Sequence, residues 1–279
     1  MGTLYIVATP IGNLADMTPR AIDVLRSVAL IAAEDTRHSA NLLRTFGIRT
    51  PTMSYHEHNR ASRSGRLMAA LSDGDVALIS DAGTPAIADP GHELVVEAIA
   101  AGHEVVPIPG PSSLVAAISA SGLAPGPFMF VGFLPRSGEE RRLVLGKAIA
   151  TGFPFVVFES PLRANRTLCE IDAAAPGRSG VVARELSKLH EEFRRGTIPE
   201  LVALYADQPP RGEVTIVVGE GPQASTSVDG NEIEALAESI LQQGVKPSKA
   251  ARELSSITGI TAAEAYELTQ RLSRTESDR

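Results

Sequence analysis

The chain has 279 residues and a mass of 29.4 kDa, a length typical of about two domains. Apolar residues make up 43% of it, which supports globular cores and excludes a disordered chain. The 33 acids and 26 bases give a net charge of −7, which excludes a uniformly basic nucleic-acid coat but allows a local basic surface. A single cysteine, Cys169, excludes an internal disulfide and a metal site made of several cysteines.

Apolar strands and amphipathic helices alternate along the first 120 residues. Short apolar runs predict strands at Thr3–Ala8, Ala29–Ala33, Val76–Ile79 and Val105–Ile108. A helix is expected between the first two strands, and the Thr18-Pro19 pair predicts where it starts. Strands that are apolar throughout and separated by helices favour a parallel sheet covered on both faces. Such sheets bind ligands beyond the carboxyl ends of their strands.

A second α/β unit is predicted after a hinge at Ala120–Pro127. Its expected strands are Phe128–Phe133, Phe155–Phe158, Gly180–Ala183 and Glu213–Val218, and its expected helices are Glu139–Ala150 and Pro161–Ala174. Thr197 and Glu200 have the spacing of a capping box, which predicts one more helix. Glu191–Arg195 is typical of an exposed antiparallel strand, so the second sheet is expected to be mixed.

A small helical tail is predicted after the polar linker Ser225–Asp229. Apolar residues at helical spacing mark its first helix, Gly244 ends that helix, and Pro247 opens the second. A capping box at Thr261–Glu264 opens the third, so the tail resembles a helix-turn-helix. The predicted domains are therefore residues 1–120 and 121–224, both α/β, and the helical module 225–279.

A membrane protein is not expected from this sequence. The N-terminus lacks a basic region followed by a long apolar stretch, so no signal peptide is expected. Residues 105–135 carry no charge and are long enough to span a bilayer. Prolines at positions 107, 109, 111, 125 and 127 interrupt any helix through that stretch. The sequence favours a soluble cytoplasmic protein.

The segment Arg37–Arg66 is strongly basic. It contains six arginines and one acid, Glu57, which gives a local net charge of +5. This pattern predicts a phosphate-binding face, with a solvated helix face as the alternative. The tail from Asp229 onward has 9 acids and 6 bases, so duplex DNA is not expected as its partner.

Two short glycine-containing loops, Ser80–Pro85 and Pro109–Ser113, follow predicted strands and could approach a ligand closely. Either loop by itself is more typical of a plain turn between a strand and a helix, and the occurrence of two in corresponding places favours a functional role. His56 and His58 have no obvious third ligand, so no metal is expected. No nucleophile elbow is found, which disfavours a hydrolase.

Six segments occur in an order that resembles the ribosomal RNA small-subunit ribose 2′-O-methyltransferases, a branch of the tetrapyrrole-methylase superfamily. They are Tyr5–Leu14, Ala33–Arg37, His56–Asn59, Ser80–Pro85, Pro109–Ser112 and Gly132–Pro135. The similarity covers residues 3 to about 221, and the tail resembles the family's C-terminal helical module. The resemblance implies 2′-O-methylation of a cytidine in the decoding region of 16S rRNA. It also implies a homodimer that holds S-adenosylmethionine in a cleft between two α/β domains.

The resemblance also implies which residues border the cofactor. Carried over by motif, they are Pro10, Gly83, Thr84, Ile87, Ser112 and Ser113, with Glu159 and Leu186 at strand ends of the second domain. The tetrapyrrole branch has a glycine-rich first loop and a Gly-Asp-Pro in a later loop. Here Val7–Pro10 and Gly83-Thr84-Pro85 stand in those places, which favours an RNA substrate over a porphyrinoid.

Methyl transfer to a ribose hydroxyl requires alignment of the hydroxyl and removal of its proton. Candidate bases are Asp35, His58, Glu185 and Lys188. Lys188 needs a lowered pKa for that role and otherwise suits a phosphate. Arginines expected to contact RNA phosphates are Arg37, Arg60, Arg63 and Arg184. The alternatives are a tetrapyrrole methyltransferase and a ligand-sensing helix-turn-helix regulator, and the acidic tail argues against the regulator.

Overall fold

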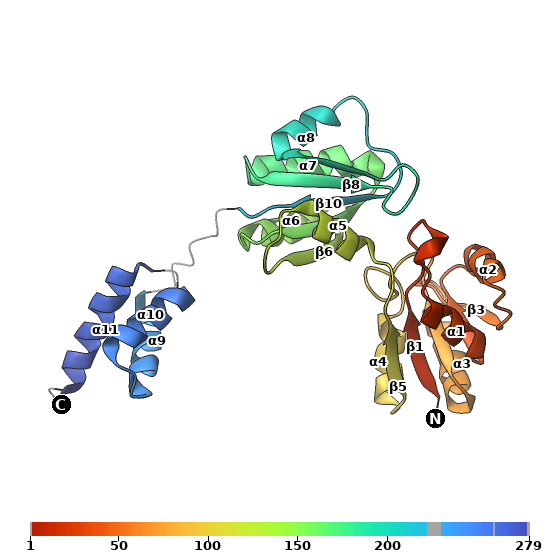
Figure 1. Ribbon diagram of the computed structural model, residues 1–279, viewed down its shortest axis with the longest axis horizontal. Coiled ribbons are helices and arrows are strands. Elements are labelled where there is room, and N and C mark those ends of the chain that lie inside the picture. Colours follow the sequence, from red (N-terminus) through yellow and green to blue (C-terminus); the bar gives the residue numbers. More distant parts are fainter. Residues whose placement is uncertain (1, 222–229, 259, 278–279) are drawn as a thin grey trace. The chain divides into compact units, whose positions relative to one another are not determined.

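The computed structural model describes the backbone of residues 2–221, 230–258 and 260–277, and all of their side chains except those of 60, 61, 230–232, 256 and 274–277. The chain divides into two compact units, Met1–Gly221 and Pro222–Arg279. The first unit contains two five-stranded sheets, and helices make up the described part of the second (Figure 1).

The first sheet is parallel throughout. Its strands are β1 (Thr3–Val7), β2 (Leu30–Ala33), β3 (Thr52–Ser54), β4 (Val76–Ile79) and β5 (Glu104–Ile108), in the order β3-β2-β4-β1-β5. The helices between them are α1 (Pro19–Ser27), α2 (Thr36–Thr45), α3 (Arg60–Asp73) and α4 (His92–Ala100), with the short 3-10 helix η1 (Leu14–Asp16) after β1.

Apolar cores on both faces of this sheet explain why its strands lack a polar side. Leu25 of α1 packs in one core with Ile31, and Leu67 of α3 and Leu94 of α4 pack in another with Leu78. All four residues of β4 are buried, as a central parallel strand requires. The expected parallel α/β architecture is therefore confirmed.

Two elements of the first sheet were not among the predicted ones. The edge strand β3 is only three residues long, and none of them is buried. Helix α3 begins with a segment rich in arginine and serine, and the large apolar side chains that it buries, Leu67 and Leu71, lie in its second half. Neither element therefore shows a full apolar period in the sequence.

The second sheet is mixed, as predicted. Its strands are β6 (Met129–Phe133), β7 (Phe155–Glu159), β8 (Ser179–Arg184), β9 (Glu192–Thr197) and β10 (Val214–Val218), in the order β6-β7-β10-β8-β9. Only the β6–β7 pair is parallel. Helices α6 (Gly138–Ala150), α7 (Pro161–Ala174) and α8 (Ile198–Leu204) accompany it, and α8 begins with the expected capping box at Thr197 and Glu200.

Helix α5 (Ser113–Ser121) connects the two sheets. It follows β5 of the first sheet, yet its buried residue Ala117 packs with Val156 and Val217 of the second. Ser112 caps the helix, because its side chain accepts a hydrogen bond from the Val115 amide at 3.5 Å. The domain boundary predicted at residue 120 falls at the end of this helix and stays a prediction.

The second unit contains helices α9 (Gly230–Gln242), α10 (Pro247–Thr258) and α11 (Ala262–Ser277). They share a small core that includes Ala237, Leu254 and Ala265. The predicted capping box opens α11: the Thr261 amide donates to Glu264 at 2.9 Å, and the Glu264 amide donates to Thr261 Oγ1 at 3.2 Å. The predicted linker Ser225–Asp229 and the turn residue Gly259 lie outside the described residues. Over the described chain, every helix is too short or too polar to cross a membrane.

Candidate functional site

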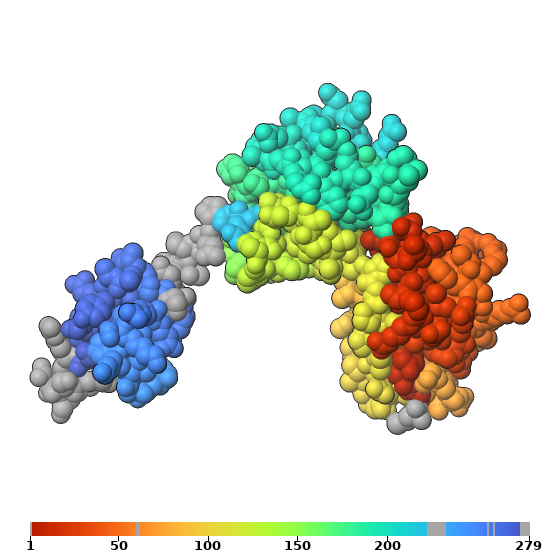
Figure 2. Space-filling model, in the orientation of Figure 1, coloured from red at the N-terminus to blue at the C-terminus, as the bar shows by residue number. Residues whose placement is uncertain are grey.

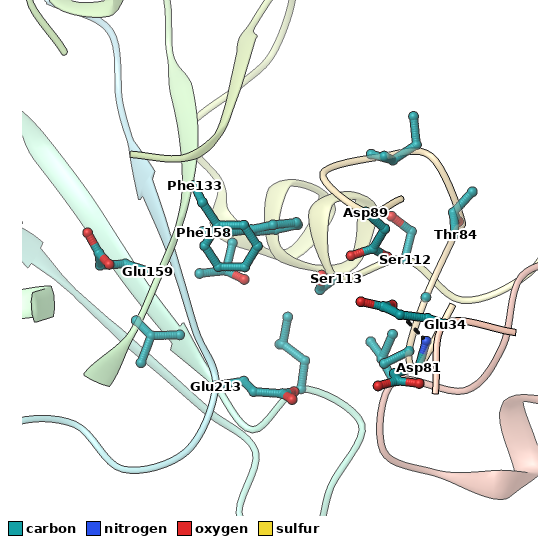
Figure 3. A pocket seen from close by; sticks show the side chains of 17 residues that line it. Glu34, Asp81, Thr84, Asp89, Ser112, Ser113, Phe133, Phe158, Glu159 and Glu213 are labelled. Carbon is teal, nitrogen blue, oxygen red and sulfur yellow. Dashed lines mark hydrogen bonds between the residues drawn. The ribbon is translucent and has the colours of Figure 1, made fainter. Parts of the chain in front are cut away.

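A cavity of about 270 Å³ lies at the carboxyl ends of the strands of the first sheet and is closed on its other side by the second sheet (Figure 3). Loops after β1, β2, β4 and β5 supply Ile11, Glu34, Gly83 and Ser112. The second sheet supplies Phe133, Phe158, Glu159, Leu186 and the start of β10. This is the position at which parallel α/β sheets bind ligands.

Hydrogen bonds hold the loops of the first sheet together at this cavity. The loops after β1 and β4 pair through Thr9 and Gly83: the Thr9 amide donates to the Gly83 carbonyl at 2.8 Å, and the reverse bond is 3.0 Å long. Thr84 Oγ1 donates to the Pro111 carbonyl at 3.3 Å, and this bond connects the loop after β5 to the loop after β4. Gly83 has a φ of +80°, a conformation that favours glycine.

Two loops that border the cavity contain non-glycine residues with a positive backbone φ angle. Among the described residues, the non-glycine residues with positive φ are Ala86 and Ala88 after β4, and Glu185 and Ser187 after β8. Such conformations cost energy and occur preferentially at binding and catalytic sites. Their position supports this cavity as the functional site.

Carboxylates dominate the polar lining of the cavity on the side of the first sheet (Figure 3). Burial, together with the negative charges of Glu34 and Asp81, raises the pKa of Asp89 to about 6, although a hydrogen bond with Ser80 opposes the shift. Burial also raises the pKa of Glu34, and the bond that it accepts from the Asp81 amide at 3.3 Å opposes this. The lining therefore suits a positively charged ligand.

Aromatic and aliphatic side chains form the apolar part of the cavity. The rings of Phe133 and Phe158 meet edge to face with centroids 5.5 Å apart. Phe133 is 57% exposed and Ile87 is 45% exposed. Large apolar side chains that remain this open beside a cavity offer surface to a flat, partly apolar ligand group.

Seven of the eight predicted cofactor residues line this cavity: Gly83, Thr84, Ile87, Ser112, Ser113, Glu159 and Leu186. The eighth, Pro10, lines a neighbouring cavity instead. Glu159 is buried, and the guanidinium of Arg163 lies 2.6 Å from its Oε1. The structure brings these residues together, and their contact with the cofactor stays a prediction.

Lys188 and Glu185 lie in the loop after β8. Lys188 Nζ donates to Glu185 Oε1 at 2.9 Å and to Glu213 Oε2 at 3.1 Å. Burial by itself lowers the pKa of Lys188, but these two carboxylates together raise it. The direction is opposite to the one that a proton-accepting lysine needs, so Lys188 carries a positive charge at neutral pH.

The same loop touches the loop after β1. A Cβ atom on Gly12 would lie 2.3 Å from Lys188 Cγ, and Ser187 Oγ donates a hydrogen bond to the Asp16 carboxylate. In Figure 2 the red surface of the N-terminal residues meets the teal surface of the second sheet there. Lys188 is therefore held against the loop after β1, where it lines the cavity next to the main one.

Asp35 and His58 do not line the main cavity. Asp35 caps α2 by accepting from the Arg37 amide at 2.8 Å, and this bond lowers the pKa of Asp35. His58 is exposed before α3, with its ring centroid 6.0 Å from that of His56. No group of three or more metal-binding side chains occurs in the part of the chain that the structure describes.

The predicted RNA-binding arginines occupy different environments. Arg37 is 93% exposed at the start of α2, and Arg63 is half-buried on α3. The side chain of Arg60 lies outside the described residues. Arg184 Nε donates to Glu192 Oε2 at 2.6 Å, which partly neutralises Arg184. The role of these arginines stays a prediction.

Sequence reasoning missed the acidic lining of Glu34, Asp81, Asp89 and Glu213. Glu34 and Asp81 follow predicted strands and Glu213 begins one, which was the available signal, whereas Asp89 lies well beyond the strand Val76–Ile79. Carboxylates at strand ends are common on protein surfaces, however, and the sequence does not show that these four face one cavity.

Comparison with known proteins agrees with this geometry. Residues 3–202 match the family of tetrapyrrole (corrin/porphyrin) methylases. Solved structures show the same fold at low sequence identity. The uroporphyrin-III C-methyltransferase of Thermus thermophilus complexed with S-adenyl homocysteine has a TM-score of 0.56 at 19% identity, over 78% of this chain and 98% of that one. A diphthine synthase has a TM-score of 0.59 at 16% identity, over 78% and 90% of the two chains.

Curated relatives are much more similar in sequence. The protein named ribosomal RNA small subunit methyltransferase I from Synechocystis sp. is 43% identical, over 98% of this chain and 99% of its own length. Proteins of the same name from Pseudomonas aeruginosa and Mesorhizobium japonicum are 44% and 45% identical. These alignments cover 93% of both chains in the first case, and 92% of this chain and 87% of the relative in the second. The chain therefore belongs to the ribosomal RNA small subunit methyltransferase I family, within the tetrapyrrole methylases.

Proposed function

We propose that this protein transfers the methyl group of S-adenosylmethionine to the ribose 2′-hydroxyl of a cytidine in the decoding region of 16S rRNA. The observation that carries the proposal is the full-length similarity to relatives named for methylation of small-subunit RNA. The neighbours whose titles name uroporphyrin methylation share at most 20% identity, so they support the fold and not a tetrapyrrole substrate.

The lining of the main cavity suits S-adenosylmethionine in its charge and in its apolar surface. Carboxylates of Glu34 and Asp89 match its positive sulfonium and amino groups, and Phe133, Phe158 and Ile87 offer apolar surface to its adenine. S-Adenosylmethionine supplies a methyl group on a positively charged sulfur, which leaves as a neutral thioether when the carbon–sulfur bond breaks. No acid is therefore needed for the leaving group, and the protein has to orient the hydroxyl and accept its proton.

Asp81 is the proposed proton acceptor. It lines both the main cavity and the adjacent one, so it lies where an acceptor hydroxyl and the methyl group would meet. The Asp35 amide donates to Asp81 Oδ1 at 3.2 Å, which orients the carboxylate and leaves Oδ2 for the hydroxyl. The proton passes to Asp81 as the carbon–oxygen bond forms, and then to solvent. Asp35, His58, Glu185 and Lys188 stay predictions for this role, and Lys188 as a cation suits a phosphate.

The proposed partners follow from the same family membership. The substrate would be 16S rRNA or the small ribosomal subunit. The exposed Arg37 and neighbouring arginines would contact it. The protein would act as a homodimer in the cytoplasm. The two sheets would serve as separate domains on either side of the cofactor.

Tritium transfer tests the proposed function directly. Purified protein and tritiated S-adenosylmethionine are incubated with small ribosomal subunits, naked 16S rRNA, uroporphyrinogen III or duplex DNA. We expect label in the RNA of at least one of the first two samples, at a single cytidine whose 2′-O-methyl group blocks alkaline cleavage. Label in uroporphyrinogen alone would instead support the tetrapyrrole alternative. Specific binding to duplex DNA without any transfer would support the regulator.

Cofactor affinity should depend on pH through Asp89. Because the pKa of Asp89 is raised to about 6, the side chain is ionised above that pH and loses its negative charge below it. A cationic cofactor favours the ionised form, so affinity should be highest above pH 7 and fall as the pH drops through 6. We expect the Kd to rise about tenfold between pH 7 and pH 5 in calorimetry, since one pH unit below the pKa costs a factor of ten.

Two comparisons isolate the contribution of Asp89 to this pH dependence. Asp89→Asn should bind more weakly at pH 7, with a flatter pH profile. S-Adenosylhomocysteine, which lacks the sulfonium charge, should show a smaller dependence with the unchanged protein. A Kd that stays constant from pH 5 to 8 would contradict this placement of the positive charge.

The tail is expected to serve substrate engagement and not cofactor binding. The first unit is compact without it, so a chain that ends at Gln223 should fold and bind S-adenosylmethionine with unchanged affinity. Methylation of small subunits should be poor at low enzyme concentration and should reach the full-length rate at saturation in single-turnover experiments. A rate that stays low at saturation would mean that the tail helps to build the active site.

A further inference from the structure

A second cavity adjoins the proposed cofactor cavity. It has a volume of about 310 Å³ and lies between α2, the loop after β1 and Lys188. Ile11, Asp81, Ala82 and Glu213 line both cavities. A third cavity, on the second sheet beside β9, shares no lining residue with either. Because an acceptor oxygen has to come within about 3–3.5 Å of the methyl carbon, the acceptor must bind next to the cofactor.

The second cavity contains a polar group that the protein itself does not satisfy. Ser39 of α2 lines the cavity and is 2% exposed, and its Oγ is buried without a hydrogen-bond partner among the described residues. A serine within a helix commonly donates to the carbonyl four residues earlier. Here the Asp35 carbonyl accepts the Ser39 amide at 2.9 Å, while the hydroxyl stays unpaired. A bound polar ligand would relieve this unfavourable state.

The remaining lining combines apolar walls with hydrogen-bond donors. Pro10, Leu14 and Leu42 provide apolar surface, of the kind that packs on the face of a nucleobase. Asn41 accepts a bond from Arg44 Nη2 at 2.6 Å through its Oδ1, and its amide N–H groups donate to no acceptor in the described part of the chain. Ribose hydroxyls and base edges are the groups that such side chains bind in RNA.

Positively charged side chains lie beside the residues of α2 that line the second cavity. Arg37 and Arg44 are exposed on α2, seven residues apart, which places them two turns or about 10.5 Å apart along the helix axis. Lys188, which lines the cavity, holds a third positive charge, which its bonds to Glu185 and Glu213 partly neutralise. Charges placed around a small polar and apolar cavity suit the phosphates on either side of a single nucleotide.

We propose that this second cavity is the acceptor subsite, which binds the ribose and base of one nucleotide that has left the RNA stack. The inference rests on the proposed function, because it assigns the acceptor of that same reaction. The cavity is at the small end of ligand pockets, so it admits one nucleoside and excludes a base pair. The ribose lies at the wall shared with the cofactor cavity, beside Asp81, and the base extends toward Ser39 and Leu42.

Two substitutions on α2 test this subsite in the full-length protein. Ser39→Ala removes the unpaired hydroxyl, so we expect the KM for small ribosomal subunits to rise about tenfold, which corresponds to about 1.4 kcal/mol. Its thermal midpoint should stay the same or rise, since no bond within the protein is lost. Thr45→Trp places a large ring on an exposed lining residue and should reduce methyl transfer at least 100-fold.

Matched controls separate the subsite from general effects on helices. Ser119 of α5 is an exposed helical serine whose hydroxyl already donates to the Ala116 carbonyl at 3.2 Å, so Ser119→Ala should leave KM unchanged. Ala40 is exposed on α2 and does not line the cavity, so Ala40→Trp should retain near-normal transfer. The Kd for S-adenosylmethionine, measured by calorimetry, should be the same in all four variants.

The outcomes distinguish this inference from the proposed function. An active wild type with normal KM in Ser39→Ala and normal transfer in Thr45→Trp would overturn the subsite and leave the proposed function standing. Equal losses in Thr45→Trp and Ala40→Trp would also overturn it. A wild type that transfers no methyl group to rRNA or small subunits would overturn both. Losses confined to the two cavity variants, with unchanged cofactor affinity, would support the subsite.

Discussion

Gly83→Val should abolish S-adenosylmethionine binding while the protein stays folded. Gly83 has a φ of +80°, and a Cβ atom there would lie 3.4 Å from Ile11 Cγ2, so a valine side chain would pack against Ile11 at the wall of the cavity. A β-branched residue at positive φ is also strained by about 1–2 kcal/mol. Either the loop after β4 shifts or its bond pair with Thr9 breaks. Because a shift of about 1 Å can cost 100-fold in a site, we expect no measurable binding heat in calorimetry.

Gly177→Val is the matched control for the backbone strain. Gly177 has a φ of +78°, and a Cβ atom there would meet nothing within 4 Å. Both variants should therefore lose similar stability in thermal unfolding, and only Gly83→Val should lose the cofactor. Wild-type affinity in Gly83→Val would place the cofactor away from this loop.

Asp81→Asn should reduce the rate of methyl transfer at saturating substrates by roughly 10²–10⁴-fold, the range expected when a proton acceptor is removed. Asparagine keeps an oxygen for the Asp35 amide, so the loop geometry should survive. Cofactor affinity should change little compared with the loss of rate. Single-turnover transfer to small subunits measures the effect without a contribution from product release.

Asp89→Asn and Lys188→Met provide the contrast for this prediction. Asp89 lines only the main cavity, so its substitution should change cofactor affinity and leave the saturated rate within about tenfold of the wild type. Lys188→Met should mainly raise the KM for RNA, since the charged lysine suits a phosphate. A full rate in Asp81→Asn together with a collapsed rate in Lys188→Met would move the proton-acceptor role away from Asp81.

Local signals in the sequence were sufficient for most elements of the fold. Thr18 with Pro19 marks the start of α1, and Thr197 with Glu200 forms the predicted capping box, because these contacts join residues only a few positions apart. The uninterrupted apolar run of β4 indicated a strand of a parallel sheet that is covered on both faces. The polar edge strand β3 carries no such signal, since an edge strand needs few apolar residues and is defined by its bonds to β2.

The candidate site could be predicted only in part. Family motifs led to Gly83, Thr84, Ser112 and other residues that line one cavity, because loops after neighbouring parallel strands meet at the same sheet edge. Asp35, a candidate base, caps α2 through its carboxylate and does not line this cavity. Whether a polar side chain caps a helix or faces a cavity depends on its orientation, which sequence spacing does not contain.

The sequence by itself determined the α/β class, the order of most elements and the family, because these depend on local periodicity, capping and ordered motifs. The tertiary structure alone decided which charged groups act together. Glu34, Asp81 and Asp89 are separated by up to 55 positions in the chain, yet they line one cavity. Burial and mutual repulsion there raise the pKa of Asp89 to about 6. For Lys188, burial lowers the pKa, and attraction to Glu185 and to the distant Glu213 raises it by more. Coulombic interaction and desolvation depend on distances in the folded chain, so no reading of neighbouring residues could have assigned these charges.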